Sequence, residues 1–391
     1  MVINEETKQY IAAHRHDDVR QLALKGCKEN NVDHAFALQQ ISAYQQIKDK
    51  LPTLAARTDV IFPVRLSLEQ CSSEETARLK GELIKGTHLA DLTGGFGIDC
   101  LALSKQFERV SYVERNEELC KIAEHNFPLL STTSIDIHHE DGIAFLRQHP
   151  EIDTVFLDPA RRTHQGGKAI LINDCEPDIS QEIELLTQNG RETWVKLSPM
   201  LDLSSALHTL PVSEAYIVSV KNECKELLLH LKEGKNEPVI TAIDISGSGE
   251  RQLFSFRPSE EATATAEIAP SIENYLYEPN AAVMKAGAFK GVGMRYGLKK
   301  LDTHSHLYTS AHMEESFCGR VFAVREQWEF NKHNLQAIRT HYVAAHVSTR
   351  NFPLGSDALR QRLKIKEGGH AYLFGTTVNR SLYIIACDRI R

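Results

Sequence analysis

Short apolar segments that end in acidic residues recur through the middle of this chain, and they constrain its fold more than any other feature. Four segments have the length and composition of buried β-strands, and they lead into Asp91, Glu114, Asp141 and Asp158. Helix-length stretches separate them, and a fifth apolar segment follows at residues 193–197. This alternation predicts βαβ units around a parallel sheet. Because ligands bind at the carboxyl ends of such strands, we expect the four acids to line one site.

The first acid begins a glycine-rich turn, Asp91-Leu92-Thr93-Gly94-Gly95-Phe96-Gly97, between a predicted strand at 88–92 and a predicted helix at 98–106. Glycine lets the backbone turn sharply and approach a ligand closely, and the N-terminus of the following helix offers free N–H groups. Glu114, seventeen residues after the last glycine, can accept hydrogen bonds from the hydroxyls of a ribose. A nucleoside-bearing cofactor is therefore predicted.

Details of the turn indicate which cofactor this is. The third glycine of a dinucleotide fingerprint is replaced by Cys100, and the chain has no G-x-x-x-x-G-K-S/T loop. Asp91 would repel a pyrophosphate but suits an ammonium group. The pattern resembles the S-adenosylmethionine loop of class I methyltransferases; an ordinary strand–helix turn is the alternative. The resemblance implies a set of cofactor-binding residues: Asp91, Thr93, Gly94, Gly95, Phe96, Gly97, Glu114, Arg115, Asp141 (toward the adenine amino group) and Gly142.

Length and composition set broad limits. A chain of 391 residues is long enough for two or three domains. No apolar run reaches the ~18 residues of a membrane span, and the N-terminus lacks a signal-peptide core, so we expect a cytoplasmic protein without a membrane partner. Eight cysteines occur without any C-x-x-C pair, which predicts free thiols rather than disulfides or a metal site.

The charge is distributed unevenly. Residues 281–391 carry 17 Lys and Arg against 8 Asp and Glu, a net charge of +9, within a chain whose total is −7. A basic C-terminal part on an acidic protein suggests a polyanion as partner, most simply nucleic acid. The alternative is that this basic surface docks onto the acidic remainder of the same molecule.

Local patterns predict several further elements. Ser72 and Glu75 fit a capping box that begins a helix, and four strand-like segments between 215 and 256 suggest an antiparallel addition to the sheet. The stretch 258–270 is poor in large apolar residues, which indicates a linker and the main domain boundary. A helix is expected over 279–289, and a hairpin turning at Asn379-Arg380 is expected to close the chain.

Several long motifs together resemble one known family. They are LSLEQCSSEETARLK, DLTGGFGIDCLALS, YVERNEELC, DPARR, NDCEPD, VKLSPMLD, NECKELL, YEPNAAVMKAGAF and KEGGHAYLFGTT. The chain resembles bacterial class I S-adenosylmethionine-dependent methyltransferases with a C-terminal THUMP-like domain. The resemblance implies an α/β fold with a Rossmann-like sheet, and RNA, either tRNA or rRNA, as substrate. It implies a methyltransferase domain over 86–257, a ferredoxin-like segment over 275–325 and a THUMP-like domain over 326–391. The residue pattern adds a helical region over 1–85 and a linker over 258–274.

The segment after the fourth strand carries the predicted catalytic residues. Amino-methylating relatives have D/N/S-P-P-Y/F there, whereas this chain has Asp158-Pro159-Ala160-Arg161, without the second proline and the aromatic ring. We predict that Asp158 and the carbonyl of Pro159 accept hydrogens from the methyl acceptor. Arg161 is predicted to stack on a base or hold a phosphate. Alternatively, Arg161 and Arg162 are structural ion-pair partners.

Basic residues in the C-terminal part are candidates for RNA contact. One group is interleaved with Phe289 and Tyr296, as in single-strand binders, and another lies near a predicted helix end. A solvated helix face, or a helix dipole that favours cations, explains the same residues without RNA. The predicted substrate-binding residues are Lys285, Lys290, Arg295, Lys299, Lys300, Arg360 and Arg362.

Other functions fit parts of the pattern. Cys175 or Cys224 could act as the nucleophile of a pyrimidine C5-methyltransferase. The chain could also be an RNA-binding protein that has lost its chemistry, or a methyltransferase for a small molecule or a protein. No sequence feature specifies the acceptor atom, the particular RNA or the oligomeric state.

Overall fold

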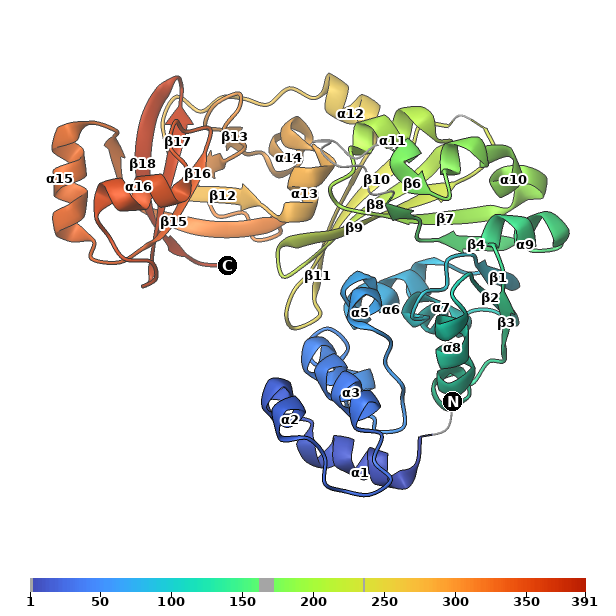
Figure 1. Cartoon of the computed structure of the whole chain (residues 1–391). Coiled ribbons are helices and arrows are strands. Elements are labelled where there is room, and N and C mark those ends of the chain that lie inside the picture. Colours follow the sequence, from blue (N-terminus) through green and yellow to red (C-terminus); the bar gives the residue numbers. More distant parts are fainter. Residues whose placement is uncertain (1–2, 162–171, 235) are drawn as a thin grey trace. The chain divides into compact units, whose positions relative to one another are not determined.

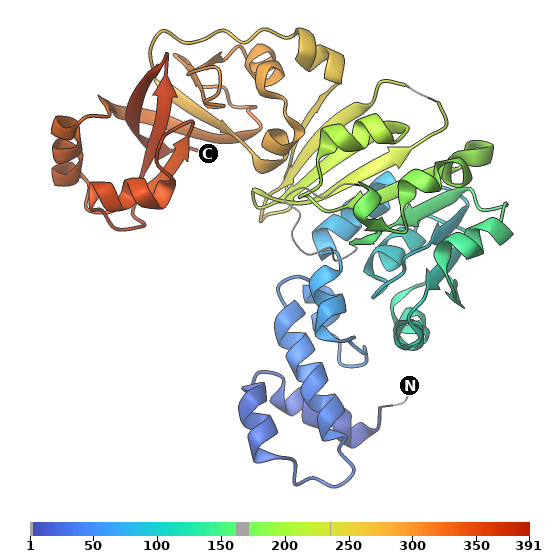
Figure 2. The same cartoon turned by 45° about the horizontal axis from the view of Figure 1, so that its top comes forward.

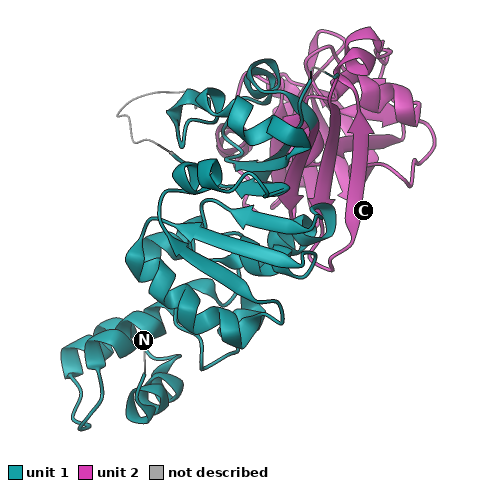
Figure 3. Ribbon diagram, turned by 90° about the vertical axis from the view of Figure 1, so that its right-hand side faces the viewer, with its two compact units in different colours: residues 1–213, 226–236 teal, residues 214–225, 237–391 magenta. Residues whose placement is uncertain are grey.

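A computed structural model describes residues 3–161, 172–234 and 236–391. The chain forms two compact units, Met1–Ser213 with Glu226–Asn236, and Glu214–Lys225 with Glu237–Arg391 (Figure 3). The first unit holds the glycine turn and all four predicted acids. The division therefore falls before the predicted linker at 258–274, and the predicted domain bounds themselves stay predictions. Among the described residues, no helix is long and apolar enough to cross a membrane.

Helices make up the N-terminal part of the first unit, as the sequence predicts. Tyr10, Leu22, Ala37 and Ile41 form the core of the first three helices, which lie together in Figures 1 and 2. The second helix stops at Gly26, whose φ of 68° a glycine adopts without strain. The helices are α1 (Glu5–His14), α2 (Val19–Lys25), α3 (His34–Ile47), α4 (Pro52–Ala55), α5 (Arg65–Gln70) and α6 (Glu74–Leu83).

The predicted parallel sheet is confirmed in the first unit. Five parallel strands run in the order β7-β4-β1-β2-β3, and β9 pairs with β7 in the antiparallel direction. The strands are β1 (His88–Asp91), β2 (Arg109–Glu114), β3 (Ile135–His139), β4 (Thr154–Leu157), β7 (Glu192–Leu197) and β9 (Glu223–Leu231). The helices between them are α7 (Ile98–Ser104), α8 (Glu117–Leu130) and α9 (Gly142–Gln148). Acidic residues consequently meet at the carboxyl edge of this sheet.

Short elements complete the first unit beyond β4. Two-residue strands β5 (Ala160–Arg161) and β6 (Cys175–Glu176) pair with each other. The helices here are α10 (Ile183–Thr187) and α11 (Leu203–Thr209), with 3₁₀ turns at Ile172–Asp174, Ile179–Gln181 and Gln188–Gly190. Arg162, a possible ion-pair partner in the sequence analysis, lies outside the described residues.

The second unit contains strand β8 (Val212–Val220) from Glu214 onward, together with β10 (Val239–Ile245) and β11 (Arg251–Phe256). β10 pairs with β11 in the antiparallel direction but with β8 in the parallel direction. The expected antiparallel addition is therefore confirmed for the pairs β7–β9 and β10–β11, and it is wrong for the pair β8–β10. The reason is that β9 returns the chain, so β10 runs the same way as β8.

A seven-stranded sheet forms the rest of the second unit, in the order β13-β14-β12-β15-β18-β17-β16. Its strands are β12 (Tyr275–Pro279), β13 (Lys299–Lys300), β14 (Tyr308–Ser310), β15 (Gly319–Glu329), β16 (His346–Arg350), β17 (Ala371–Val378) and β18 (Ser381–Arg389). The helices are α13 (Ala281–Ala286), α14 (Phe289–Tyr296), α15 (Lys332–His341) and α16 (Ser356–Leu363). The predicted C-terminal hairpin is confirmed, because Asn379 and Arg380, with φ of 42° and 70°, form its turn.

Two local predictions in this unit need correction. Pro279 closes strand β12 instead of opening a helix, and Asn280 caps α13 by accepting from the Val283 N–H at 2.9 Å. Asparagine is a preferred N-cap, so the helix begins at Ala281, two residues later than expected. The stretch expected to be a linker contains a short helix, α12 (Pro258–Thr263).

Candidate functional site

The glycine turn follows β1 and needs its glycines for geometric reasons. Gly95 and Gly97 have φ of 55° and 83°, values that other L-residues adopt only with strain. A β-carbon on Gly94 would lie 2.1 Å from the Tyr112 ring, and one on Gly97 would lie 2.7 Å from Phe127. The turn therefore packs directly onto the next strand and helix.

Glu114, at the end of β2, holds this turn in place. One carboxylate oxygen accepts from the Gly95 N–H at 2.8 Å, and the other accepts from the Asn116 N–H at 2.8 Å. The Tyr112 hydroxyl donates to the Gly95 carbonyl at 2.6 Å. Each carboxylate oxygen keeps a further lone pair, so Glu114 can still accept from a ribose hydroxyl.

Asp91 lies beneath the turn. Its side chain is buried, with 1% of the residue exposed, and one oxygen accepts from the Thr93 N–H at 3.2 Å. Burial raises the pKa of Asp91 well above its ordinary value, and the nearby Asp99 carboxylate adds to the rise. The Thr93 hydroxyl accepts from the backbone N–H of Asp158 at 2.6 Å. Thr93 thus connects the turn to the end of β4.

The acid after β3 has a local structural role. Asp141 caps α9, since its carboxylate accepts from the Ala144 N–H at 2.9 Å. Arg115 reaches Glu176 at 3.0 Å and Asp141 at 3.9 Å. These contacts place Arg115 and Asp141 together at the carboxyl edge of the sheet, and their predicted contacts with a cofactor stay predictions.

Two other predicted cofactor residues act through packing in the structure. A β-carbon on Gly142 would lie 2.2 Å from the Leu92 carbonyl oxygen, so only glycine allows this approach. The Phe96 ring is buried in a core cluster and meets Phe62 edge-on at 6.2 Å. Phe96 can therefore contribute backbone groups to a ligand site more readily than its ring.

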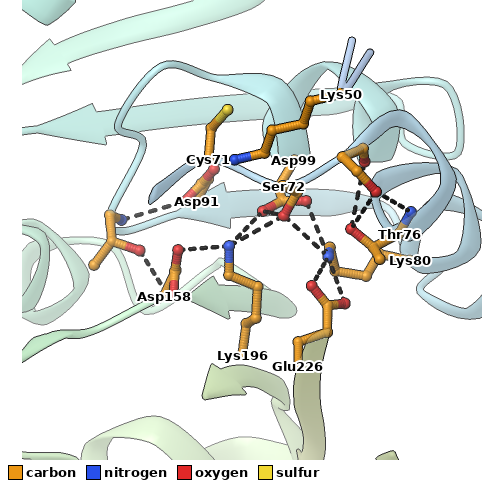
Figure 4. Close-up of polar contacts among 12 residues, drawn as sticks. Lys50, Cys71, Ser72, Thr76, Lys80, Asp91, Asp99, Asp158, Lys196 and Glu226 are labelled. Atoms are coloured by element: carbon orange, nitrogen blue, oxygen red, sulfur yellow. Dashed lines mark hydrogen bonds and ion pairs between the residues drawn. The ribbon is translucent and has the colours of Figure 1, made fainter. Parts of the chain in front are cut away.

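A buried ion pair lies beside Asp158 (Figure 4). Lys196, on β7, places its ammonium nitrogen 2.6 Å from Oδ2 of Asp158 and 3.1 Å from Oδ2 of Asp99. The same nitrogen donates to the Ser72 hydroxyl at 3.1 Å. Its three donors are thereby all occupied.

A second buried lysine continues this network (Figure 4). Lys80, on α6, is 0% exposed and donates to both Glu226 oxygens, at 2.6 and 2.8 Å. Its ammonium also lies 3.2 Å from Oδ1 of Asp99 and 3.2 Å from the Ser72 hydroxyl. Ser72 in turn donates to Oδ2 of Asp99 at 2.7 Å. We call Ser72, Lys80, Asp99, Asp158, Lys196 and Glu226 the buried charge network.

Ser72 therefore does not begin a helix. Ser73 is the N-cap of α6, and its hydroxyl accepts from the Thr76 N–H at 3.3 Å. The predicted capping box with Ser72 was wrong by one residue, because the Ser72 hydroxyl is taken by Asp99 and the two lysines.

Opposite charges inside the network shift several pKa values. Burial alone would raise the pKa of Asp99, but Lys196 and Lys80 outweigh it and lower the pKa to about 2. Burial likewise opposes the charged form of Lys196, yet Asp158, Asp99 and Glu226 raise its pKa well above the ordinary value. For Asp158, burial raises the pKa and the Lys196 ammonium opposes that rise. Lys196 is thus a buried ammonium group that faces the carboxylates of Asp99 and Asp158 together.

The sequence analysis missed most of this network, although its members lie within the family motifs. A faint indication was present: Lys196 interrupts the apolar segment Thr193–Leu197, which is otherwise typical of a fully buried strand. A lysine at such a position requires a buried partner. The partner's identity depends on the neighbouring elements, which the sequence pattern does not give.

The predicted catalytic residues other than Asp158 are less fully described. Pro159 is buried directly after β4, and Arg161 pairs through its backbone with Cys175. The side chain of Arg161 lies outside the described part of the structure, so its predicted role stays a prediction. The Cys175 side chain is buried.

The predicted RNA-contacting residues of α14 and its surroundings are largely engaged within the protein. Lys300 is a correction: it is buried, and its ammonium donates to the Thr303 carbonyl at 2.6 Å, so it does not face solvent. Arg295 lies over the Phe254 ring at 4.3 Å and donates to the Ser255 carbonyl. Lys290 donates to the Ala262 carbonyl, and Lys299 pairs with Glu273. Lys285 lies on α13.

The two arginines predicted on α16 differ from each other. Arg360 forms ion pairs with Asp357 at 2.5 Å and with Glu367 at 3.3 Å. Arg362 is exposed, and its guanidinium lies 5.3 Å from the centre of the Phe330 ring. Within the described residues, no acidic side chain pairs with Arg362.

The chain is similar to several known proteins. Family models of a ferredoxin-like domain and of a THUMP domain-like region match residues 275–317 and 319–389. The crystal structure of a candidate methyltransferase from Porphyromonas gingivalis W83 has 33% sequence identity, a TM-score of 0.90 and coverage of 100% of both chains. Two curated relatives, from the CDC 1551 / Oshkosh and H37Rv strains of Mycobacterium tuberculosis, are named uncharacterized S-adenosylmethionine-dependent methyltransferases. Each is 24% identical over 309 residues, which cover 77% of this chain and 80% of the relative.

Proposed function

The chain belongs to the class I S-adenosylmethionine-dependent methyltransferases with a C-terminal THUMP-like domain, the family of the P. gingivalis protein, and we propose that it methylates a nucleotide in structured RNA, either tRNA or rRNA. S-adenosylmethionine is the cofactor of this family, and the sheet is the Rossmann-like one that the sequence predicted. The RNA substrate is the part that goes beyond family membership.

The residues around the glycine turn fit an adenosyl cofactor. Glu114 keeps lone pairs for ribose hydroxyls, and the turn at Gly95 and Gly97 leads into the N-terminus of α7. Asp91 supplies a carboxyl group beside the turn and is buried. When bound, the cofactor supplies a methyl group already activated on a sulfonium sulfur.

The position of Asp158 is the observation that best supports the proposed chemistry. It follows β4 directly, is joined to the glycine turn through Thr93, and keeps 36% of its side chain exposed although Lys196 lies against it. We assign to it the role of accepting a hydrogen from the methyl acceptor, with the Pro159 carbonyl as a second acceptor. Positioning two reactants in this way can lower a barrier by about 7–11 kcal/mol.

Charge and domain content support RNA as the substrate. Residues 281–391 carry a net charge of +9, and the THUMP-like match lies inside this basic part. Phosphate groups attract such a surface without regard to base sequence. In this proposal the basic C-terminal part recognises structured RNA, and the first unit transfers the methyl group.

Nucleoside mass spectrometry tests the proposal. RNA from cells that lack the protein is incubated with the purified protein and a deuterated-methyl cofactor, then digested and compared with RNA incubated with Asp158→Asn. We expect one labelled nucleoside with the wild-type protein, and at least a hundredfold less label with the variant. Label in no RNA fraction would reject RNA as the substrate.

Two alternatives give different results in the same assay. A protein that only binds RNA would retain RNA on a filter in a salt-dependent way but transfer no label. A methyltransferase for a small molecule or a protein would consume the cofactor with cell extract but leave RNA unlabelled. Cysteine-dependent C5-methylation predicts that Cys175→Ser or Cys224→Ser abolishes the transfer, whereas direct transfer predicts that both variants stay active.

A further inference from the structure

We propose that Lys196 is a positioning residue that keeps the Asp158 carboxylate ionised and oriented, and that the methyl acceptor is consequently a nucleotide atom that carries its own N–H or O–H. This inference rests on the proposed function and names the class of acceptor for it. The evidence is the geometry of the buried charge network.

The network fixes Lys196 on every side. Its ammonium donates to Asp158, Asp99 and Ser72, and each of the last two also contacts Lys80. Lys80 is in turn held by both oxygens of Glu226. Because every donor of both ammonium groups has an acceptor, neither lysine can turn away from its partners without leaving a buried charge unpaired.

This anchoring leaves one oxygen of Asp158 for the reaction. Lys196 lies against Oδ2, and no described residue bonds Oδ1. An ionised carboxylate only accepts hydrogen bonds. Oδ1 can therefore orient an amino group or a hydroxyl and take its proton, whereas a hydrogen-free ring nitrogen has no hydrogen to donate to it.

Methyl transfer to such an acceptor breaks one bond for each bond that it forms. The lone pair of the acceptor nitrogen or oxygen forms the bond to the methyl carbon, while the bond from that carbon to sulfur breaks and leaves its electron pair on sulfur. The proton of the acceptor moves to Oδ1 of Asp158 and later to solvent. Neither an oxidant nor a thiol nucleophile is needed.

The charge state of Asp158 depends on groups from four other elements. Lys196 on β7 and Lys80 on α6 favour its ionised form, whereas Asp99 on α7 opposes it. Asp91 at the end of β1 is also close enough to interact with Asp158 electrostatically. Lys196 is in direct contact at 2.6 Å, so removing its charge has the largest effect among these groups.

Titration of the carboxyl group tests the role of Lys196 without any substrate. The Asp158 resonance is followed from pH 4 to 9 in protein labelled with ¹³C at aspartate carboxyls, and it is assigned by its absence in Asp158→Asn. In Lys196→Gln we expect the pKa of Asp158 to rise by a unit or more. In Asp99→Asn we expect it to fall, because a like charge is removed and Lys196 remains. If Lys196→Gln does not fold, Asp99→Asn still tests the inference, because the expected change in the pKa of Asp158 then has the opposite sign.

Methyl transfer to RNA from cells lacking the protein supplies the second measurement. For Lys196→Gln we expect at least tenfold slower transfer at pH 6 and recovery toward pH 9, whereas Lys196→Arg keeps the wild-type pH profile. A purely structural role would slow transfer equally at all pH values. Lys121→Gln, which removes an exposed lysine paired with Glu117 on α8, is the matched control and should change nothing.

The outcomes separate the two proposals. An unchanged Asp158 pKa in Lys196→Gln, or in Asp99→Asn where the Lys196 variant does not fold, overturns the inference about Lys196. A labelled product methylated on a ring carbon or on a hydrogen-free ring nitrogen overturns the acceptor class, whereas an N-methylamino or O-methyl nucleoside supports it. If the wild type labels no RNA, the proposed function fails, and the carboxyl titration still decides the role of Lys196.

Discussion

The carboxylate of Glu114 accepts a hydrogen bond from the backbone N–H of Gly95 at 2.8 Å, so the end of one strand fixes the turn that follows its neighbour. This bond joins the two features by which the sequence predicted a nucleoside cofactor. Glu114 thus fixes the shape of the turn, and its bond to a ribose stays a prediction.

Replacing Glu114 by Gln should weaken cofactor binding. The neutral amide loses the charge-assisted bonds to Gly95 and to a ribose hydroxyl, each worth about 1.5–3 kcal/mol. We therefore expect the dissociation constant of S-adenosylmethionine, measured by calorimetry, to increase about 10- to 100-fold. Glu117→Gln, an exposed acid on α8 paired with Lys121, is the control and should bind normally. Equal affinity of wild type and Glu114→Gln would contradict the assignment.

Breaking the Lys80–Glu226 pair should destabilise the first unit. In Glu226→Leu the ammonium of Lys80, which is 0% exposed, loses both of its closest acceptors. Removing one partner of a buried ion pair costs about 3–5 kcal/mol of unfolding free energy. Because Asp99 and Ser72 stay beside the Lys80 ammonium, we expect the lower end of this range. Urea unfolding should show this loss, and the double variant Lys80→Met with Glu226→Leu should recover part of it. If the double variant loses about another 3–5 kcal/mol of unfolding free energy relative to Glu226→Leu, Lys80 and Glu226 do not stabilise the fold as a pair.

Acid should remove a stabilising contribution of Asp99. Its pKa is about 2 in the folded protein and 3.8 ordinarily, so the unfolded chain binds the proton more readily. The contribution is therefore fully present above about pH 4 and is lost as the pH falls toward 2. Unfolding free energies between pH 5 and 2.5 should fall more steeply for wild type than for Asp99→Asn. Parallel curves would show that Asp99 is not held by the lysines.

Arg362 and Arg360 should differ in their contribution to RNA binding. Arg362 has no acidic partner among the described residues, whereas Arg360 is paired with Asp357 and Glu367. In filter binding of total RNA across a salt series, Arg362→Ala should reduce the magnitude of the salt slope by about 0.7–0.9. Arg360→Ala should change it much less. The reverse order would argue that α16 does not face RNA through Arg362.

Local patterns were sufficient for much of the first unit's fold. Apolar segments bounded by polar ones predicted the parallel strands, and β4 begins and ends where its apolar run does, at Thr154 and Leu157. Asn379 and Arg380, which the structure places at positive φ, predicted where the last hairpin turns. These features depend only on neighbours along the chain. Predictions failed where the pairing partner mattered, as in the parallel pairing of β8 with β10.

By itself the sequence determined the strand and helix alternation, the glycine turn and the acids that follow the strands, because periodicity and backbone freedom are local properties. Only the tertiary structure decided that Lys80 and Glu226, 146 residues apart, would bond to each other, and that Lys196 would lie against Asp158. A buried charge must find its counter-charge through packing, and that choice depends on which elements become neighbours. Charge along the chain likewise suggested Lys300 as an RNA contact, and burial decided against it.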